Sequence, residues 1–122
     1  MGKNNSEIDS TTINLISTGT NINGDITSNS DIRIDGILDG NLTTKGRLVI
    51  GESGRIKGEI SCKNADISGI IEGKITVSEL LSLKATSMIT GEIVTGRLAV
   101  EPGCKFNGTC KIEDSSIKPL DK

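Results

Sequence analysis

Few residues in this chain could carry chemistry, and the three cysteines are the first candidates. Cys62, Cys104 and Cys110 form no C-x-x-C pair, and the chain of 122 residues contains no histidine. Most zinc sites are built from cysteine pairs or histidine, and Ser–His or Cys–His nucleophiles need histidine as their base. We therefore predict three reduced thiols, no metal site and no catalytic residue. Cys110 is predicted to be a small buried hydrophobe.

Carboxylates and a glycine–lysine pair are the remaining candidates for chemistry. Glu59, Glu72 and Glu92 each lie two residues from a Lys or Thr, on the same face of a strand, which is typical of solvated charges on an outward face. The segment 68–75, Ser-Gly-Ile-Ile-Glu-Gly-Lys-Ile, resembles a phosphate-binding P-loop but lacks its first Gly and its final Ser or Thr. The sequence thus predicts a protein that is not an enzyme and that binds no nucleotide or other cofactor.

The same glycine–lysine pair belongs to a repeat that organises most of the chain. An apolar–x–Gly–x–apolar pattern occurs six times, and the steps between its glycines are 16, 18, 15, 18 and 17 residues. The six glycines are Gly24, Gly40, Gly58, Gly73, Gly91 and Gly108. A nearly fixed period of this kind is the signature of an architecture whose units stack on one another.

Within each repeat the apolar residues alternate with polar ones. Residues 32–42 and 65–77 carry an apolar or glycine residue at every second position, which is the period of a β-strand and not of a helix. Several short strands in each turn of about 17 residues predict an all-β, single-domain β-solenoid with three sides and about six rungs over residues 13–112. The polar segments 1–12 and 113–122 are predicted to be disordered tails.

Stacked rungs place equivalent residues in columns along the rod. The predicted inward column contains Ile22, Leu38, Ile56, Ile71, Ile89 and Phe106. On the outside, Lys57 should lie above Glu72 and Glu59 above Lys74. Opposite charges placed one rung apart stabilise the pairing of strands and disfavour a slip of register.

Charge and hydropathy exclude several classes of partner. The net charge is −2 and the pI about 5.1, so no basic field favours nucleic acid. No apolar run approaches the roughly 20 residues that cross a bilayer, and the chain does not open with a signal-peptide pattern. We predict a cytoplasmic protein with no nucleic-acid partner.

The two open ends of such a stack are the predicted sites of self-association. Uncapped strands expose unpaired N–H and C=O groups, which favour pairing with another chain. Phe106, the only aromatic residue, falls in the last copy of the repeat. We predict self-contacts through Phe106 and Ile112 at one end and through Leu15, Ile16 and Ile22 at the other.

The stretch from Ile13 to Ile112 resembles the bactofilins, a family of bacterial polymer-forming cytoskeletal proteins. The motifs that carry the resemblance, in the family's order, are Asn23-Gly24-Asp25-Ile26, Ile32-Arg-Ile34-Asp35-Gly36, Leu48-Val49-Ile50-Gly51-Glu52-Ser53-Gly54, Gly58-Glu59-Ile60, Gly91-Glu92-Ile93 and Glu101-Pro102-Gly103. The resemblance implies a right-handed β-helix between disordered tails. It also implies nucleotide-independent assembly into non-polar filaments by head-to-head and tail-to-tail stacking.

The same resemblance implies a scaffolding role, in which the polymer positions cell-wall enzymes or inner-membrane proteins and thereby affects cell shape. Such partners would be reached through the tails, at the inner face of the cell membrane. Membrane-binding bactofilins carry bulky hydrophobic residues near the initiator Met. Here residues 1–6, Met-Gly-Lys-Asn-Asn-Ser, offer one lysine and no aromatic anchor, so direct membrane binding is not predicted.

Two other classes of β-helical protein fit this sequence less well. Left-handed hexapeptide-repeat acyltransferases keep a strict 18-residue turn and typically use histidine, whereas this chain has turns of 15 to 18 residues and no histidine. Ice-binding β-helices need a flat column of threonines on one face. The outward columns here are expected to mix Asn, Asp, Lys, Glu and Thr, without such a column.

Overall fold

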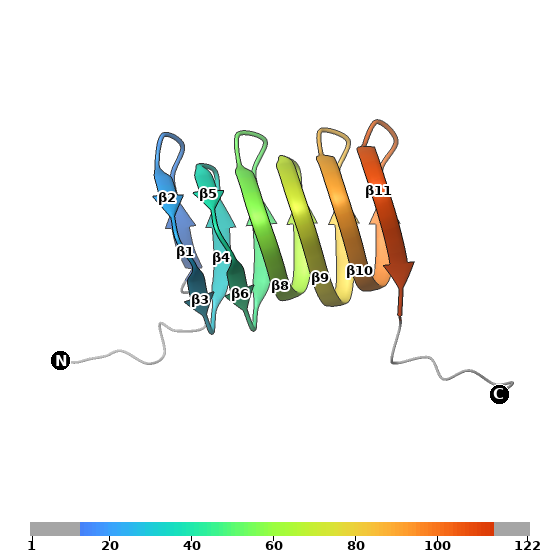
Figure 1. Ribbon diagram of the computed structural model, residues 1–122, viewed down its shortest axis with the longest axis horizontal. Helices are drawn as coiled ribbons and strands as arrows, with labels where there is room; N and C mark the ends of the chain where they lie inside the picture. Colours follow the sequence, from blue (N-terminus) through green and yellow to red (C-terminus); the bar gives the residue numbers. More distant parts are fainter. Residues whose placement is uncertain (1–12, 114–122) are drawn as a thin grey trace, which may run out of the picture.

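The computed structural model describes residues 13–113, and this part of the chain winds into a rod of β-strands (Figure 1). The strands are β1 (Ile13–Ile16), β2 (Asn21–Asn23), β3 (Ile26–Ser28), β4 (Asp31–Ile34), β5 (Ile37–Asp39), β6 (Leu42–Thr44), β7 (Arg47–Ile50), β8 (Arg55–Ile67), β9 (Ile70–Leu83), β10 (Met88–Val100) and β11 (Lys105–Ile112). The long strands β8, β9 and β10 each follow the chain around three sides of the coil.

Every strand pairs in parallel with the equivalent segment one turn away, which produces three ladders. Ladder 1 consists of β1, β4, β7 and residues 64–67, 80–83 and 97–100. Ladder 2 consists of β2, β5 and residues 55–57, 70–72, 88–90 and 105–107. Ladder 3 consists of β3, β6 and residues 60–62, 75–77, 93–95 and 110–112. Six segments stack in each ladder, as the six copies of the glycine pattern predict.

The coil is right-handed. In Figure 1 the chain advances from left to right, the front strands of ladders 2 and 3 run downward, and the back strands of ladder 1 run upward. The predicted fold, a three-sided right-handed β-helix of six rungs, is therefore confirmed.

The core consists of aliphatic columns that run along the rod. The predicted column from Ile22 to Phe106 is in register throughout ladder 2. Its four central members, from Leu38 to Ile89, are 0% exposed. Burial of each such side chain contributes about 1.5–3 kcal/mol, so these columns supply most of the driving force for folding.

The outward charges follow the predicted register, but their ion pairs differ from the prediction. Lys57 lies beside Glu72 in the ladder and Glu59 beside Lys74. Glu72 nevertheless takes Arg55 as its partner, with the Arg55 Nη2 3.2 Å from the Glu72 Oε2. Arg55 lies diagonally opposite Glu72, and a long side chain can span the diagonal between paired strands.

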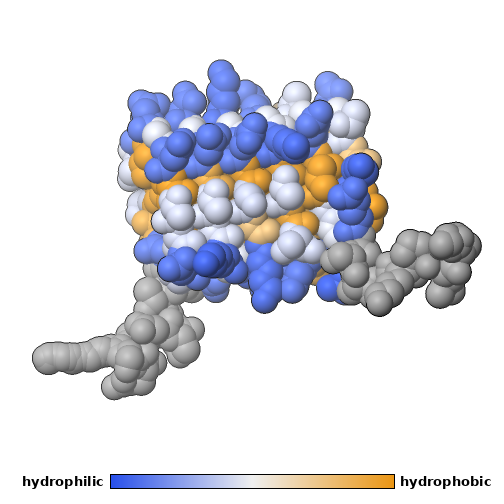
Figure 2. Space-filling view, turned by 60° about the horizontal axis from the view of Figure 1, so that its bottom comes forward, coloured by the Kyte–Doolittle hydropathy of each residue, from blue (hydrophilic) through white to orange (hydrophobic). Residues whose placement is uncertain are grey.

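One outward column is less mixed than expected, although no column among residues 13–113 consists of threonine on all six rungs. Thr27, Thr43, Ser61 and Thr76 lie in register on four successive rungs of ladder 3, before Val94 interrupts them. We call these four residues the hydroxyl column. Figure 2 shows that residues of similar hydropathy form rows along the rod, as stacked rungs require. The glycine pattern could have revealed this column, because each of its four members lies three residues after a glycine of the repeat.

The predicted tails fall almost entirely outside the described residues, which exclude 1–12 and 114–122. Glu113 is the exception, and its N–H donates a hydrogen bond of 2.7 Å to the carbonyl oxygen of Thr95. The ladder thus extends one residue beyond the predicted boundary at Ile112. Between residues 13 and 113, no helix is long and apolar enough to cross a membrane.

Candidate functional site

The long sides of the rod carry no metal cluster in the part of the chain that the structure describes. No group of three or more His, Cys, Asp or Glu residues gathers among residues 13–113 in a way that could hold an ion. A shallow hollow on ladder 3 is lined by Thr43, Ser61 and Thr76, with Glu59 and Lys74 beside them. These residues project from a continuous strand surface, so the hollow lacks the enclosing walls that a small-molecule site needs.

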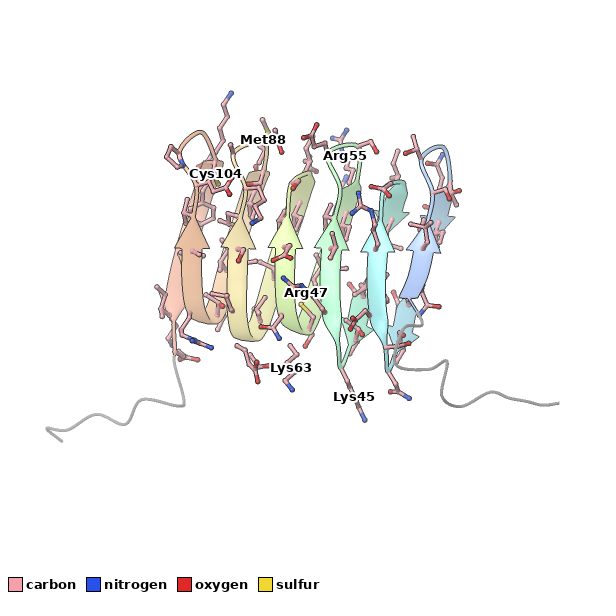
Figure 3. All side chains as sticks on the ribbon, turned by 180° about the vertical axis from the view of Figure 1, so that it is seen from behind. Lys45, Arg47, Arg55, Lys63, Met88 and Cys104 are labelled. Atoms are coloured by element: carbon pink, nitrogen blue, oxygen red, sulfur yellow. The ribbon has the colours of Figure 1, made fainter. Side chains whose placement is uncertain are left out.

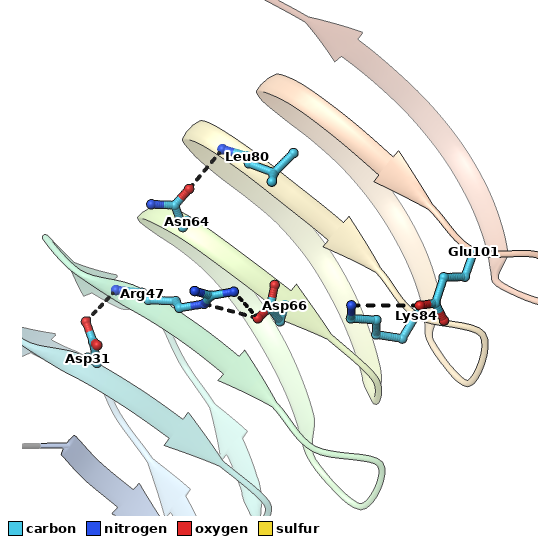
Figure 4. Close-up of polar contacts among 7 residues, drawn as sticks. All are labelled: Asp31, Arg47, Asn64, Asp66, Leu80, Lys84 and Glu101. Carbon is cyan, nitrogen blue, oxygen red and sulfur yellow. Dashed lines mark hydrogen bonds and ion pairs between the residues drawn. The ribbon is translucent and has the colours of Figure 1, made fainter.

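Polar side chains on the sides connect one rung to the next (Figure 4). The Asp31 Oδ1 accepts a hydrogen bond of 2.9 Å from the backbone N–H of Arg47, and the Arg47 Nε donates to Asp66 at 3.0 Å. Asn64 accepts a bond of 3.2 Å from the N–H of Leu80. Exposed pairs of this kind contribute at most about 1 kcal/mol each. Their positions indicate that they hold the register of the stack.

The cationic side chains are distributed around the rod and do not gather in one stripe. Figure 3 shows Arg47 in the middle of the back face and Lys45 and Lys63 near its lower edge. Arg33 is paired with Asp35 at 2.9 Å, and this hydrogen bond raises the pKa of the guanidinium above its ordinary value. The polar side chains on the sides of the rod therefore hold the register and contact water.

The last rung leaves an apolar surface at the C-terminal end of the rod. Val100, Phe106 and Ile112 are 54%, 38% and 57% exposed. Each continues the inward column of a different ladder, so all three lie at the end of the core. Their exposure follows from position, because the equivalent residues of the preceding rung are covered and these are not. We call these three residues the C-terminal triad.

The N-terminal end has a different composition. Ile16, Ile22 and Ile26 are partly buried against the core. Asn14 and Ser28 occupy two further inward columns at this end. The Asn14 Nδ2 donates a hydrogen bond of 3.2 Å to the Ser28 Oγ, which joins ladder 1 to ladder 3 across the end. A polar bridge thus lies beside a smaller apolar surface.

The structure divides the five predicted contact residues among three places. Phe106 and Ile112 lie together at the C-terminal end, while Ile16 and Ile22 lie at the opposite end of the rod. Leu15 belongs to an outward column of ladder 1 and is 59% exposed on the side of the rod. We therefore centre the proposed N-terminal contact on the two isoleucines.

Sequence reasoning missed two end residues. Val100 is the last member of a column whose earlier members are buried, and the final Leu98-x-Val100 pair could have identified it. Asn14 offered no comparable signal, because a single asparagine near a chain end does not reveal that it faces inward.

The three cysteines lie in three different environments. All three are free thiols. Cys62 is buried, and this burial raises the pKa of its thiol to about 12. Cys104 is half-buried and its sulfur accepts a bond of 3.1 Å from the Ser87 Oγ. Cys110 is exposed, so the prediction that it is buried is wrong. Its column does face inward, but residues 13–113 form no seventh rung that would cover it.

Comparison with known proteins agrees with this architecture. Residues 14–111 match the family described as "Bactofilin: Polymer-forming cytoskeletal". The chain is also similar to bactofilin BacP of Myxococcus xanthus (strain DK1622), with 28% identity over 98 residues, which cover 80% of this chain and 40% of BacP. Bactofilin BacO of the same organism is 27% identical over 92 residues, which cover 75% of this chain and 73% of BacO.

A solved structure shows the same fold. The cytoskeletal bactofilin BacA, determined by solid-state NMR, superimposes with a TM-score of 0.73 at 31% identity, covering 80% of this chain and 93% of BacA. The family match spans most of the β-helix, and the structural match shows the same coil. This chain therefore belongs to the bactofilin family of polymer-forming cytoskeletal proteins.

Proposed function

We propose that this protein is a cytoskeletal scaffold that assembles end to end, without nucleotide, into non-polar filaments. The observation that carries the proposal is the C-terminal triad of Val100, Phe106 and Ile112. A monomer that leaves the end of its core uncovered exposes apolar surface to water, at a cost of about 25 cal/mol for each Å². A second copy of the same end covers that surface, and a contact between identical ends is self-complementary.

The backbone supports the same proposal. Within residues 13–113, β11 pairs on one side with β10, and its other edge faces away from the rod. Such an edge presents unpaired N–H and C=O groups that can pair with another chain. Apolar side chains and free backbone groups thus occur on the same surface, which suits a stacking contact.

Nucleotide independence is supported by the local structure of the one phosphate-like segment. Ile70 to Ile75 belong to β9 and pair on both sides, with β8 and with β10. A P-loop instead needs a loop whose N–H groups are free to surround a phosphate. In this chain Gly73 and Lys74 serve the repeat, so we propose that polymerisation needs no nucleotide.

We further propose that the filament positions other proteins, such as cell-wall enzymes or inner-membrane proteins, in the cytoplasm or at the inner face of the cell membrane. The family relationship and the regular sides of the rod support this role. The chain spans 40% of the length of BacP, so the activities of that longer protein do not transfer directly. Partner contacts through residues 1–12 and 114–122 lie outside the described part of the chain.

Electron microscopy of three purified proteins tests the proposal. The wild-type chain should form filaments at micromolar concentration, equally with and without added nucleotide. Phe106→Arg places a charge on the apolar end and should abolish long filaments, because burial of an unpaired charge is strongly unfavourable. Ile37→Arg is the matched control, since Ile37 is 43% exposed on the side of the rod. Filaments of Phe106→Arg as long as those of the control would refute the proposed contact.

A further inference from the structure

The two ends of the rod differ in what they offer a second copy. At the C-terminal end, all three ladders finish in an exposed hydrophobic side chain, Val100, Phe106 or Ile112. At the N-terminal end, the apolar residues Ile16 and Ile22 are already partly buried against their own core. The C-terminal end therefore has more apolar surface to lose on contact.

The N-terminal end also contains polar groups in columns that are apolar further along the rod. Asn14 is in register with Ile32, which is 1% exposed, so the asparagine occupies a core column. Its amide bonds the Ser28 Oγ at 3.2 Å and the Ser30 Oγ at 3.5 Å. Among residues 13–113 these groups use only part of their hydrogen-bonding capacity, so a contact that removes their water is disfavoured.

Stacking of one C-terminal end on the N-terminal end of another copy would match these columns poorly. The column that ends in Leu98 begins at Asn14, and the column that ends in Ile112 begins at Ser28. If the C-terminal end of one copy stacked on the N-terminal end of another, Leu98 and Ile112 would cover the polar bridge between Asn14 and Ser28. Two C-terminal ends instead place apolar surface against apolar surface.

We propose that the two self-contacts are unequal, with a tight contact between C-terminal ends and a weak contact between N-terminal ends. The assembling unit is then a dimer joined through its C-terminal ends, and elongation depends on the weaker, more polar contact. This inference rests on the proposed end-to-end assembly and adds the order in which its contacts form.

Sedimentation velocity of single-end variants tests the order. Ile22→Arg disables the N-terminal end and should leave dimers joined through the C-terminal end. Phe106→Arg disables the C-terminal end and should leave dimers joined through the N-terminal end. The dissociation constant of these dimers should be at least about tenfold higher than that of the Ile22→Arg dimers, a difference of roughly 1.4 kcal/mol. Ile37→Arg is again the control and should polymerise like the wild type. Equal dissociation constants, or tighter dimers of Phe106→Arg, would overturn the proposal.

Cross-linking of the unmutated chain provides a second measurement that does not depend on the folding of a variant. Cys110 is exposed on the C-terminal rung, and Cys62 is buried. A short bis-maleimide, added at protein concentrations too low for filaments, should give covalent dimers that Cys110→Ser lacks. Filaments without any such dimer at low concentration would leave end-to-end assembly intact but refute the proposed order. A wild-type chain that stays monomeric at all concentrations would refute the assembly itself.

Discussion

Gly73 lies directly beside Gly58 on the neighbouring rung, and the Cβ that Gly73 lacks would clash with the Gly58 carbonyl oxygen. The backbone of Gly73 also has a φ of 134°, which residues with a side chain rarely adopt. Backbone shape and close approach of rungs therefore both require glycine here. This relationship explains why the repeat is marked by glycine at the bend between ladders 2 and 3.

Gly73→Ala should destabilise the fold more than Gly24→Ala. The two glycines have similar φ values, 134° and 136°, so a side chain strains the backbone about equally at both. Only Gly73 has a neighbouring rung in the way, whereas the Cβ of an alanine at position 24 would find nothing within 4 Å. We expect Gly24→Ala, which adds backbone strain alone, to lower the free energy of unfolding by roughly 1–2 kcal/mol. Gly73→Ala should lower it by a clearly larger amount.

Urea unfolding followed by circular dichroism measures both losses. It should be carried out on the Phe106→Arg background, which cannot form filaments, and at a concentration low enough that its N-terminal dimers are dissociated. Equal destabilisation by the two substitutions would show that the close approach of the rungs is not a reason for glycine at position 73.

Thr44→Val should cost more stability than Thr43→Val. The side chain of Thr44, the last residue of β6, faces inward, and its Oγ1 donates to the Ser30 carbonyl at 2.7 Å and accepts from the Gly46 N–H at 3.1 Å. Loss of the hydroxyl leaves the partly buried Gly46 N–H without this acceptor and removes one of the two hydrogen bonds to the Ser30 carbonyl, the other coming from the Ser28 Oγ, at a cost of about 1–3 kcal/mol. Thr43 belongs to the outward hydroxyl column, so its valine variant should stay within about 0.5 kcal/mol of the parent. Comparable unfolding free energies for the two variants would contradict this role of the Thr44 hydroxyl.

Cys62 should make the fold sensitive to alkaline pH. Burial raises its thiol pKa from 9.0 to about 12, so above pH 9 the unfolded chain releases this proton while the folded chain retains it. The contribution of the protonated Cys62 thiol to the free energy of unfolding is fully present below pH 9. It is lost as the pH rises toward 12, at up to about 1.4 kcal/mol for each pH unit. Cys62→Val removes the titrating group.

Unfolding free energies at pH 8 and pH 10 of the parent and of Cys62→Val test this linkage. The parent should lose more stability than the variant between these values, and a thiol reagent should modify Cys110 quickly and Cys62 only after unfolding. An identical pH dependence of the two proteins would show that the Cys62 thiol is not protected in the fold.

The sequence predicts the repeating part of this molecule well and its ends poorly. Alternation and the spacing of glycines suffice for the β-helix, since every inner rung has the same two neighbours. Cys110 shows the limit, because its column is buried wherever another rung follows and exposed where none does. The inward position of Asn14 and the outward position of Leu15 depend on the register of the first rung, which has only one neighbour to define it.

The most direct test of the account is a helical reconstruction of the wild-type filament by electron cryomicroscopy. Six rungs at the usual spacing of 4.7–4.9 Å make each subunit about 29 Å long. Alternating contacts between like ends predict an axial repeat of about 58 Å that contains two oppositely directed rods, with Phe106 of one rod facing Phe106 of the next. A filament in which all rods point the same way would contradict the account.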